Sequence, residues 1–225
     1  DLYGWCHREV RPSRLREHRM QPIIGQIFSA VRWLHNLGIA HGDLSLENVL
    51  LTEGRGGQLL VRVIDFGAAT LGQTRCGIRG KNSYQAPEMA SRRHRSSGGE
   101  VHLSDKEGVE YDAFLADTFA LGVLLHSLAA QDYPWASTRL NTCPHFEHAR
   151  AAGYRTFLAS RRLRSGHLEA LIKVFSPGLV DILDGLLKIE PQERLTLGEA
   201  CYREQQRKSV WSEEWMKGWV EPTHR

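Results

Sequence analysis

The stretch AFLADTFALGVLLHSLAA at 113–130 most constrains the fold, because nearly every residue in it is apolar. A helix with one apolar face can lie on a protein surface, whereas a helix that is apolar all round must be surrounded by other elements. A chain of 225 residues can bury such a helix within one domain or one large lobe. No uninterrupted apolar run reaches the roughly 18 residues of a membrane span, and Asp117 and His126 interrupt this stretch, so we predict no membrane span.

The residues before this stretch predict one helix and one hairpin. Apolar residues recur at helical spacing over 21–38, and Gly38 is expected to end that helix. The segments 49–52 and 59–64 are predicted strands, and the glycine-rich EGRGGQ between them predicts the turn. The predicted fold class is therefore mainly α with a small β-hairpin.

Two more helices are predicted after the apolar stretch. The first covers 177–188, with Ser176 as its N-terminal cap. The second covers 196–208, where Thr196 followed three residues later by a glutamate has the spacing of a capping box. The stretch 91–108, SRRHRSSGGEVHLSDKEG, has no periodicity and is predicted to be an exposed, mobile insert.

The overall composition excludes few classes of protein. Hydrophobic residues make up 41% and charged residues 24%, as in ordinary globular proteins. The net charge of +3 is too mild to indicate nucleic-acid binding, so no nucleic-acid partner is predicted. The four cysteines are far apart and unpatterned, which favours reduced thiols and a cytoplasmic or nuclear location.

Three motifs follow one another along the chain: HGDLSLENVL at 41–50, VIDFGAA at 63–69 and GKNSYQAPE at 80–88. In this order they resemble the C-terminal lobe of a eukaryotic protein kinase, whose motifs are H-R-D-L-x-x-x-N, D-F-G and A-P-E. Two later stretches extend the resemblance. DTFALGV at 117–123 is similar to the family's D-x-W-x-x-G-V, and IEPQERLT at 189–196 is similar to its D-P-x-x-R-x-T.

The resemblance covers residues 1–205, with 91–108 as an insert, and leaves 206–225 as a C-terminal extension. Two motifs of the kinase N-terminal lobe are missing: the G-x-G-x-x-G-x-V loop and the V-A-I-K lysine. We therefore expect a partial domain, a protein-kinase-like C-lobe without its N-lobe, with little or no activity on its own.

The resemblance implies transfer of phosphate from ATP to Ser or Thr of a protein substrate, with Mg²⁺ as the metal. Asp43 matches the residue that accepts the proton of the substrate hydroxyl. Asn48 and Asp65 match the residues that bind magnesium and ATP, and their side-chain oxygens suit a hard cation. Asp1 falls where the family often has the acidic residue that contacts the ATP ribose.

Six matched residues are implied to build the scaffold rather than to react: His41, Phe66, Gly67, Glu88, Asp117 and Arg194. Glu88 and Arg194 match a buried ion pair, and Asp117 matches a carboxylate that accepts backbone hydrogen bonds from the loop around Asp43. The two aromatic rings are expected to pack, and the glycine is expected to let the backbone turn sharply.

Three positions depart from the family pattern. Gly42 stands where the family usually has an arginine that binds a phosphate on the activation loop, so we expect activity that does not depend on phosphorylation of that loop. Ser45 stands where Ser/Thr kinases usually have a lysine, and Lys81 stands where they usually have a threonine. Lys81 is therefore a candidate for the displaced catalytic cation, with an ordinary surface lysine as the alternative.

Two functions remain open on this sequence. The first is a protein kinase, and the alternative is a pseudokinase or lobe-only binding scaffold without catalysis. The presence of Asp43, Asn48 and Asp65 favours the kinase, because a scaffold has no chemical need for all three. The missing N-lobe motifs and the substitutions at Gly42 and Ser45 favour the scaffold.

Overall fold

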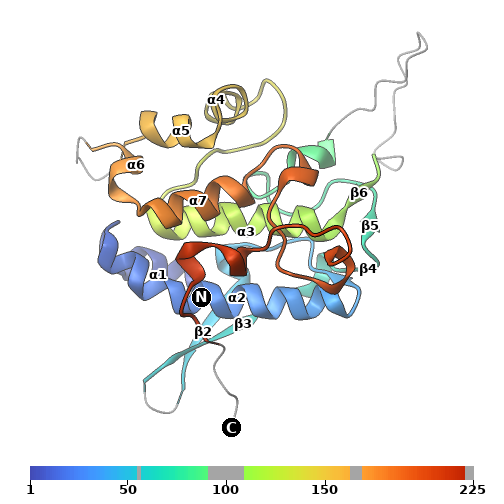
Figure 1. The fold of residues 1–225 in the computed structure, drawn as a ribbon, viewed down its shortest axis with the longest axis horizontal. Coiled ribbons are helices and arrows are strands. Elements are labelled where there is room, and N and C mark those ends of the chain that lie inside the picture. The colour runs from blue at the N-terminus through green and yellow to red at the C-terminus, as the bar shows by residue number, and fades with distance from the viewer. Residues whose placement is uncertain (55–56, 91–108, 163–168, 221–225) are drawn as a thin grey trace.

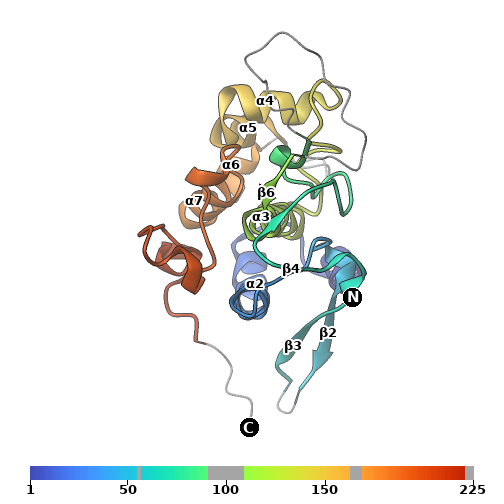
Figure 2. The same cartoon turned by 90° about the vertical axis from the view of Figure 1, so that its right-hand side faces the viewer.

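The apolar stretch forms the central helix of the protein, α3 (Ala113–Ala130), in which every residue is buried. The structure is a computed structural model that describes residues 1–54, 57–90, 109–162 and 169–220. Figure 1 shows α3 lying between α2 (Arg14–Asn36) and α7 (Pro177–Leu186), and both helices contact it. Figure 2 looks along α2 and α3, which lie side by side.

The argument that α3 is too short and too interrupted by polar residues to cross a membrane was wrong. The helix has 18 residues and is apolar enough to cross a membrane by length and composition alone. All of that window is buried inside the protein, which is also the pattern of a core helix in a soluble fold. The absence of a membrane span therefore stays a prediction.

Helix α2 was predicted from residue 21 but begins at Arg14, after Ser13, whose hydroxyl accepts a hydrogen bond from the Arg16 amide. The first turns of α2 do not show the apolar periodicity of a helix because they bury a charged residue. Arg16 is completely buried and donates hydrogen bonds to three backbone carbonyls, those of Cys6, Val10 and Leu128. A guanidinium whose donors are satisfied in this way can lie in a core.

The predicted hairpin is confirmed. Strands β2 (Val49–Glu53) and β3 (Leu59–Val63) pair antiparallel, and they extend away from the helices in Figure 1. Two shorter antiparallel pairs follow, which the sequence did not indicate. Strand β1 (Ile39–Ala40) pairs with β4 (Thr70–Leu71), and β5 (Thr74–Arg75) pairs with β6 (Tyr111–Asp112).

The remaining helices were not predicted, apart from α7. Its cap is as expected, since the Ser176 hydroxyl accepts a hydrogen bond from the Leu179 amide at 3.0 Å. The other α-helices are α1 (Leu2–Arg8), α4 (Pro144–Ala152), α5 (Tyr154–Ser160) and α6 (Leu171–Val174). The 3-10 turns are η1 (Leu46–Asn48), η2 (Phe66–Ala68), η3 (Pro87–Ala90), η4 (Pro191–Glu193), η5 (Ala200–Tyr202), η6 (Val210–Ser212) and η7 (Glu214–Met216).

The helix predicted over 196–208 is wrong, because only the short turn η5 forms there. Thr196 and Glu199 do not make a capping box. The Glu199 carboxylate accepts a hydrogen bond from the Leu197 amide, and its other oxygen contacts His35 on α2. The predicted insert 91–108 lies outside the described residues.

Arg194 and Glu88 form the ion pair that the sequence resemblance implied. The guanidinium of Arg194 is buried and binds both carboxylate oxygens of Glu88, at 2.6 and 3.0 Å. It also donates to the carbonyls of Leu115 in α3 and of Lys188 and Ile189 after α7. This one side chain therefore joins the segment around Glu88 to the central helix and to the late part of the chain.

We predict that Arg194→Met lowers the free energy of unfolding by about 3–5 kcal/mol, because it leaves the Glu88 carboxylate and several carbonyls without their donor. Urea denaturation measures this change. Arg155→Met is the matched control, since Arg155 pairs with Asp181 on the surface, where ion pairs contribute about 0–1 kcal/mol. If the two variants lost equal amounts of unfolding free energy, Arg194 would not stabilise the core in the way proposed.

Candidate active site

A buried carboxylate on α3 holds the loop that carries Asp43. The side chain of Asp117 accepts hydrogen bonds from the backbone amides of His41 at 2.6 Å and Gly42 at 2.9 Å. The His41 ring is fully buried, and its Nε2 contacts the carbonyl of Ile64 at 3.0 Å. The loop is thus fixed to the core on one side and to the end of β3 on the other.

Asp43 is oriented by Asn48, five residues later. The Asn48 amide group donates to the Asp43 carbonyl at 2.8 Å and to the Asp43 carboxylate oxygen Oδ2 at 3.2 Å. The other carboxylate oxygen, Oδ1, is buried and has no hydrogen-bond partner among the described residues. An unpartnered buried acceptor is uncommon in a folded protein. This oxygen is therefore the one that is able to accept a proton or a hydrogen bond from a ligand.

Asp65 lies close to Asn48 through the backbone, because the amide of Ile64 donates to the Asn48 carbonyl at 2.9 Å. Its own backbone is left-handed, with φ 64° and ψ 76°, which is rare outside glycine and recurs at functional sites. One carboxylate oxygen accepts a hydrogen bond from the Gly67 amide, and the side chain is exposed. The Asp65 carboxylate is therefore open to a ligand.

The oxygens of Asn48 and Asp65 fit a magnesium ion only together with a ligand that supplies further oxygens. Among the described residues, no three His, Cys, Asp or Glu side chains gather as a metal site. Magnesium is commonly held by one or two protein oxygens plus phosphate oxygens and water. The donor set therefore suits a metal that arrives with a phosphate compound better than a metal bound by protein alone.

Lys81 and Ser45 meet beside Asp43. The Lys81 ammonium donates to the Ser45 hydroxyl at 2.5 Å and pairs with the Glu47 carboxylate at 2.9 Å. Its neighbour Gly80 lies against the catalytic loop, since a β-carbon there would be 3.2 Å from Asp43 Oδ1. The contact with Lys81 lowers the pKa of Glu47 although burial opposes this shift. The two departures from the family pattern, Ser45 and Lys81, are thus in direct contact.

Of two further site predictions, the packing of Phe66 is confirmed only in part, and the ribose contact of Asp1 stays a prediction. Phe66 was expected to pack, but its side chain is 47% exposed and contacts the His41 ring on one side, with centroids 5.0 Å apart. Asp1 caps α1, where its carboxylate accepts a hydrogen bond from the Gly4 amide at 2.7 Å.

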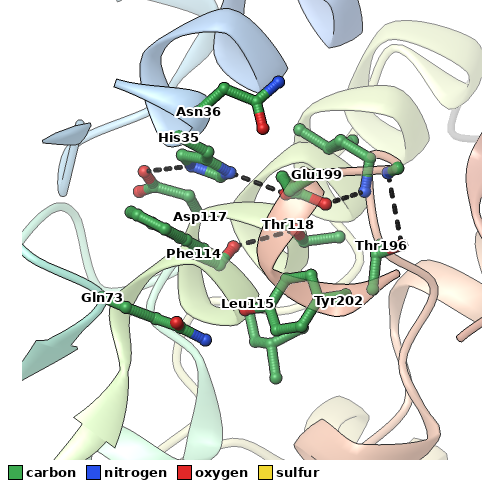
Figure 3. A network of polar contacts seen from close by, with 12 residues as sticks. His35, Asn36, Gln73, Phe114, Leu115, Asp117, Thr118, Thr196, Glu199 and Tyr202 are labelled. Carbon is green, nitrogen blue, oxygen red and sulfur yellow. Dashed lines mark hydrogen bonds and ion pairs between the residues drawn. The ribbon is translucent and has the colours of Figure 1, made fainter. Parts of the chain in front are cut away.

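Sequence reasoning missed a buried network behind the loop, shown in Figure 3. His35 on α2 lies between two carboxylates, with Nε2 3.2 Å from Asp117 and Nδ1 2.7 Å from Glu199. Burial alone would lower the pKa of His35, but the hydrogen bonds and the charges of the two carboxylates outweigh it and raise the pKa to about 8. A histidine 164 positions before its partner carries no local signal, so the pattern could not reveal it.

Comparison with known proteins finds a family match over most of the chain. The sequence model of the protein kinase domain matches residues 5–205. Similar proteins include a probable serine/threonine-protein kinase, fhkA, of Dictyostelium discoideum, with 29% identity over 83% of this chain and 32% of that protein. CBL-interacting protein kinase 24 of Oryza sativa subsp. japonica is 28% identical, over 90% of this chain and 36% of that protein. Testis-specific serine/threonine-protein kinase 5 of Mus musculus is 29% identical, over 83% and 41%.

The chain spans less than half the length of each of these three relatives. The described residues within this match form a helical core with a small hairpin and two very short strand pairs.

The His35 network predicts that stability falls at alkaline pH. A pKa raised by folding contributes stability fully below the unfolded value of 6.5 and loses it as the pH rises through about 8. That difference corresponds to about 2 kcal/mol. Urea denaturation between pH 6 and pH 9.5 measures the loss.

Glu199→Gln removes one of the two carboxylates and is expected to move the loss of stability to lower pH. His18→Gln is the control, because His18 is exposed on the same helix. If Glu199→Gln leaves the pH profile where it is in the parent protein, His35 does not titrate in this way.

Proposed function

The chain belongs to the protein kinase family, and from this premise we propose that it is the larger, helical lobe of a serine/threonine protein kinase. The proposed reaction transfers phosphate from ATP to a Ser or Thr hydroxyl of a protein substrate. The names of the similar proteins support the serine/threonine class. The three two-stranded sheets formed by the described residues support assignment to the helical lobe of the domain.

The free oxygen of Asp43 carries this proposal. Asn48 holds Oδ2 and the carbonyl of Asp43, which leaves Oδ1 as the carboxylate oxygen without a hydrogen-bond partner among the described residues. A carboxylate oriented in this way accepts the proton of a substrate hydroxyl as phosphoryl transfer proceeds. No described group of the protein donates to that oxygen, which supports its role as the acceptor.

We propose that Asn48 and Asp65 hold Mg²⁺ together with ATP phosphate oxygens. The metal, when bound, neutralises charge on the phosphates. Asn48 is suited to the task because its amide nitrogen is used by Asp43, which turns the amide oxygen away from that carboxylate. Asp65 is suited because its strained backbone presents an exposed carboxylate next to β3. Asp1 remains the proposed contact to the ATP ribose, by resemblance alone.

Lys81 is proposed as the cation that meets the transferring phosphoryl group. This proposal is supported by the hydrogen bond of its ammonium to Ser45, the residue that stands where Ser/Thr kinases usually have a lysine. The ion pair with Glu47 is partly exposed and therefore contributes little to holding Lys81 in place, so the ammonium can exchange one anion for another.

We predict that Asp43→Asn lowers turnover by about 100-fold or more, because general-base groups contribute at least that factor. The free energy of unfolding is expected to change little, since an amide keeps the shape and the acceptor for Asn48. Turnover is measured with Mg²⁺, ATP and a Ser/Thr peptide on the longest gene product that contains these residues. Asp181→Asn, on the surface of α7, is the control.

Near-parental turnover in Asp43→Asn would contradict the assignment of the base. A parent protein that binds partners but shows no turnover under any of these conditions would favour the scaffold function instead.

We predict that Lys81→Ala lowers turnover about 10-fold or more with a smaller effect on ATP affinity, because the cation acts mainly on charge that builds in the transition state. The double variant Ser45→Lys with Lys81→Thr restores the usual family arrangement and is expected to recover part of the loss. A silent Lys81→Ala, or a double variant no better than the single one, would leave Lys81 as a surface lysine.

A further inference from the structure

Gly42 allows a close contact that no other residue would permit. Its φ of +77° lies in the left-handed region, where a side chain is strained. A β-carbon added there would be 2.7 Å from the carbonyl oxygen of Ala68, a distance that real side chains do not show. The catalytic loop and the segment after Asp65 therefore approach each other through backbone atoms alone.

The space beside Gly42 is taken by a guanidinium from elsewhere in the chain. Nη1 of Arg75 donates to the carbonyl of Ala68 at 2.7 Å. The same nitrogen would lie 3.2 Å from the β-carbon of any side chain at position 42. Arg75 is half-buried on strand β5, which pairs with β6 directly before the central helix. It is thus anchored to the core when it reaches Ala68.

Ala68 is well placed for this contact to matter. It ends the turn η2, three residues after Asp65, and the next amide, that of Ala69, bonds back to the Phe66 carbonyl. A donor on the Ala68 carbonyl therefore holds the last residue of the turn that presents the Asp65 carboxylate. The acceptor is a backbone carbonyl, so the contact needs no phosphate on either side.

Other hydrogen bonds hold the rest of this segment, including one from the Gln73 amide group to the Asp112 carboxylate at 2.6 Å. The Ala113 amide donates to the Gln73 carbonyl at 2.7 Å, and the Tyr111 hydroxyl donates to the Gly77 carbonyl at 2.9 Å. Further along, the Gln85 amide group donates to the Gly80 carbonyl at 2.8 Å. Hydrogen bonds from other residues of the protein therefore hold the segment from Gln73 to Gly80, and none of these bonds needs a phosphate.

We propose that Arg75 is a positioning residue that fixes the Asp65–Ala68 turn from the space left by Gly42, so that the turn is ordered without a phosphate. The contact itself does not depend on the proposed function. Its consequence for catalysis rests on the proposed role of Asp65 as a metal ligand.

Hydrogen exchange tests the contact on the 225-residue chain without any assay of activity. Arg75→Ala is expected to speed exchange of the amides of Gly67 and Ala69 by about 10-fold, because local opening there becomes easier. The amides of α3 are expected to keep their protection. Arg75→Lys retains a charged donor and is expected to restore most of the protection, whereas Arg79→Ala, an exposed cation of the same segment, is expected to change nothing.

Three outcomes would overturn the proposal: unchanged exchange at Gly67 and Ala69 in Arg75→Ala, equal acceleration across α3, or no rescue by lysine. The catalytic consequence is tested separately on the longest gene product. There Arg75→Ala is expected to raise the Mg²⁺ concentration needed for half-maximal turnover, with phosphatase treatment of the parent without effect. Loss of exchange protection with unchanged Mg²⁺ dependence would keep the contact and reject the metal-ligand role of Asp65.

Discussion

The carboxylate of Asp117 is the interaction on which the site depends. It lies in the second turn of α3, a helix that is buried along its whole length and mostly apolar. An ionised carboxylate in such a place is stable only if its oxygens are hydrogen-bonded. The amides of His41 and Gly42 and the ring of His35 supply these bonds. The core therefore tolerates the carboxylate because the loop around Asp43 donates hydrogen bonds to it, and the same hydrogen bonds hold the loop in place.

Two further buried charges extend this coupling to the late part of the chain. Glu199 satisfies the second nitrogen of His35, and Arg194 joins Glu88 to the carbonyls of Leu115 and Lys188. Removing one member of such a set leaves the others buried and unpaired, which costs more than the pair contributes in an intact protein. Residues about 160 positions after the loop thus help to set its geometry.

The sequence predicts well whatever depends on local pattern. The central helix, the hairpin and the cap at Ser176 follow from periodicity and turn chemistry, and they form as expected. Predictions fail where a distant partner decides. The start of α2 was missed because Arg16 is buried by carbonyls, and the helix at 196–208 was wrong because Glu199 binds His35 instead of a helix end.

In the candidate site, too, local spacing predicts some features, and contacts between distant segments decide the others. Motif spacing places Asp43 and Asn48 in one loop, and the structure brings them into contact, but the exposure of Phe66 could not be read from spacing. The motifs also give no distances between segments. Only the folded chain brings Lys81 onto Ser45, because the two residues are 36 positions apart.

The two departures from the family pattern on the loop around Asp43 have a common physical reason. Gly42 and Ser45 are positions where the family pattern has long cationic residues. In each case a cation from the segment after Asp65 lies beside the small residue on the loop. Arg75 lies next to Gly42, and Lys81 binds Ser45. A small side chain on the loop makes room for a long one from the opposite side, so packing and charge are conserved together while the chain position changes. For that reason the loop motif alone understates the positive charge around Asp43. The effect of a substitution on this loop therefore depends on which residues the segment after Asp65 places beside it.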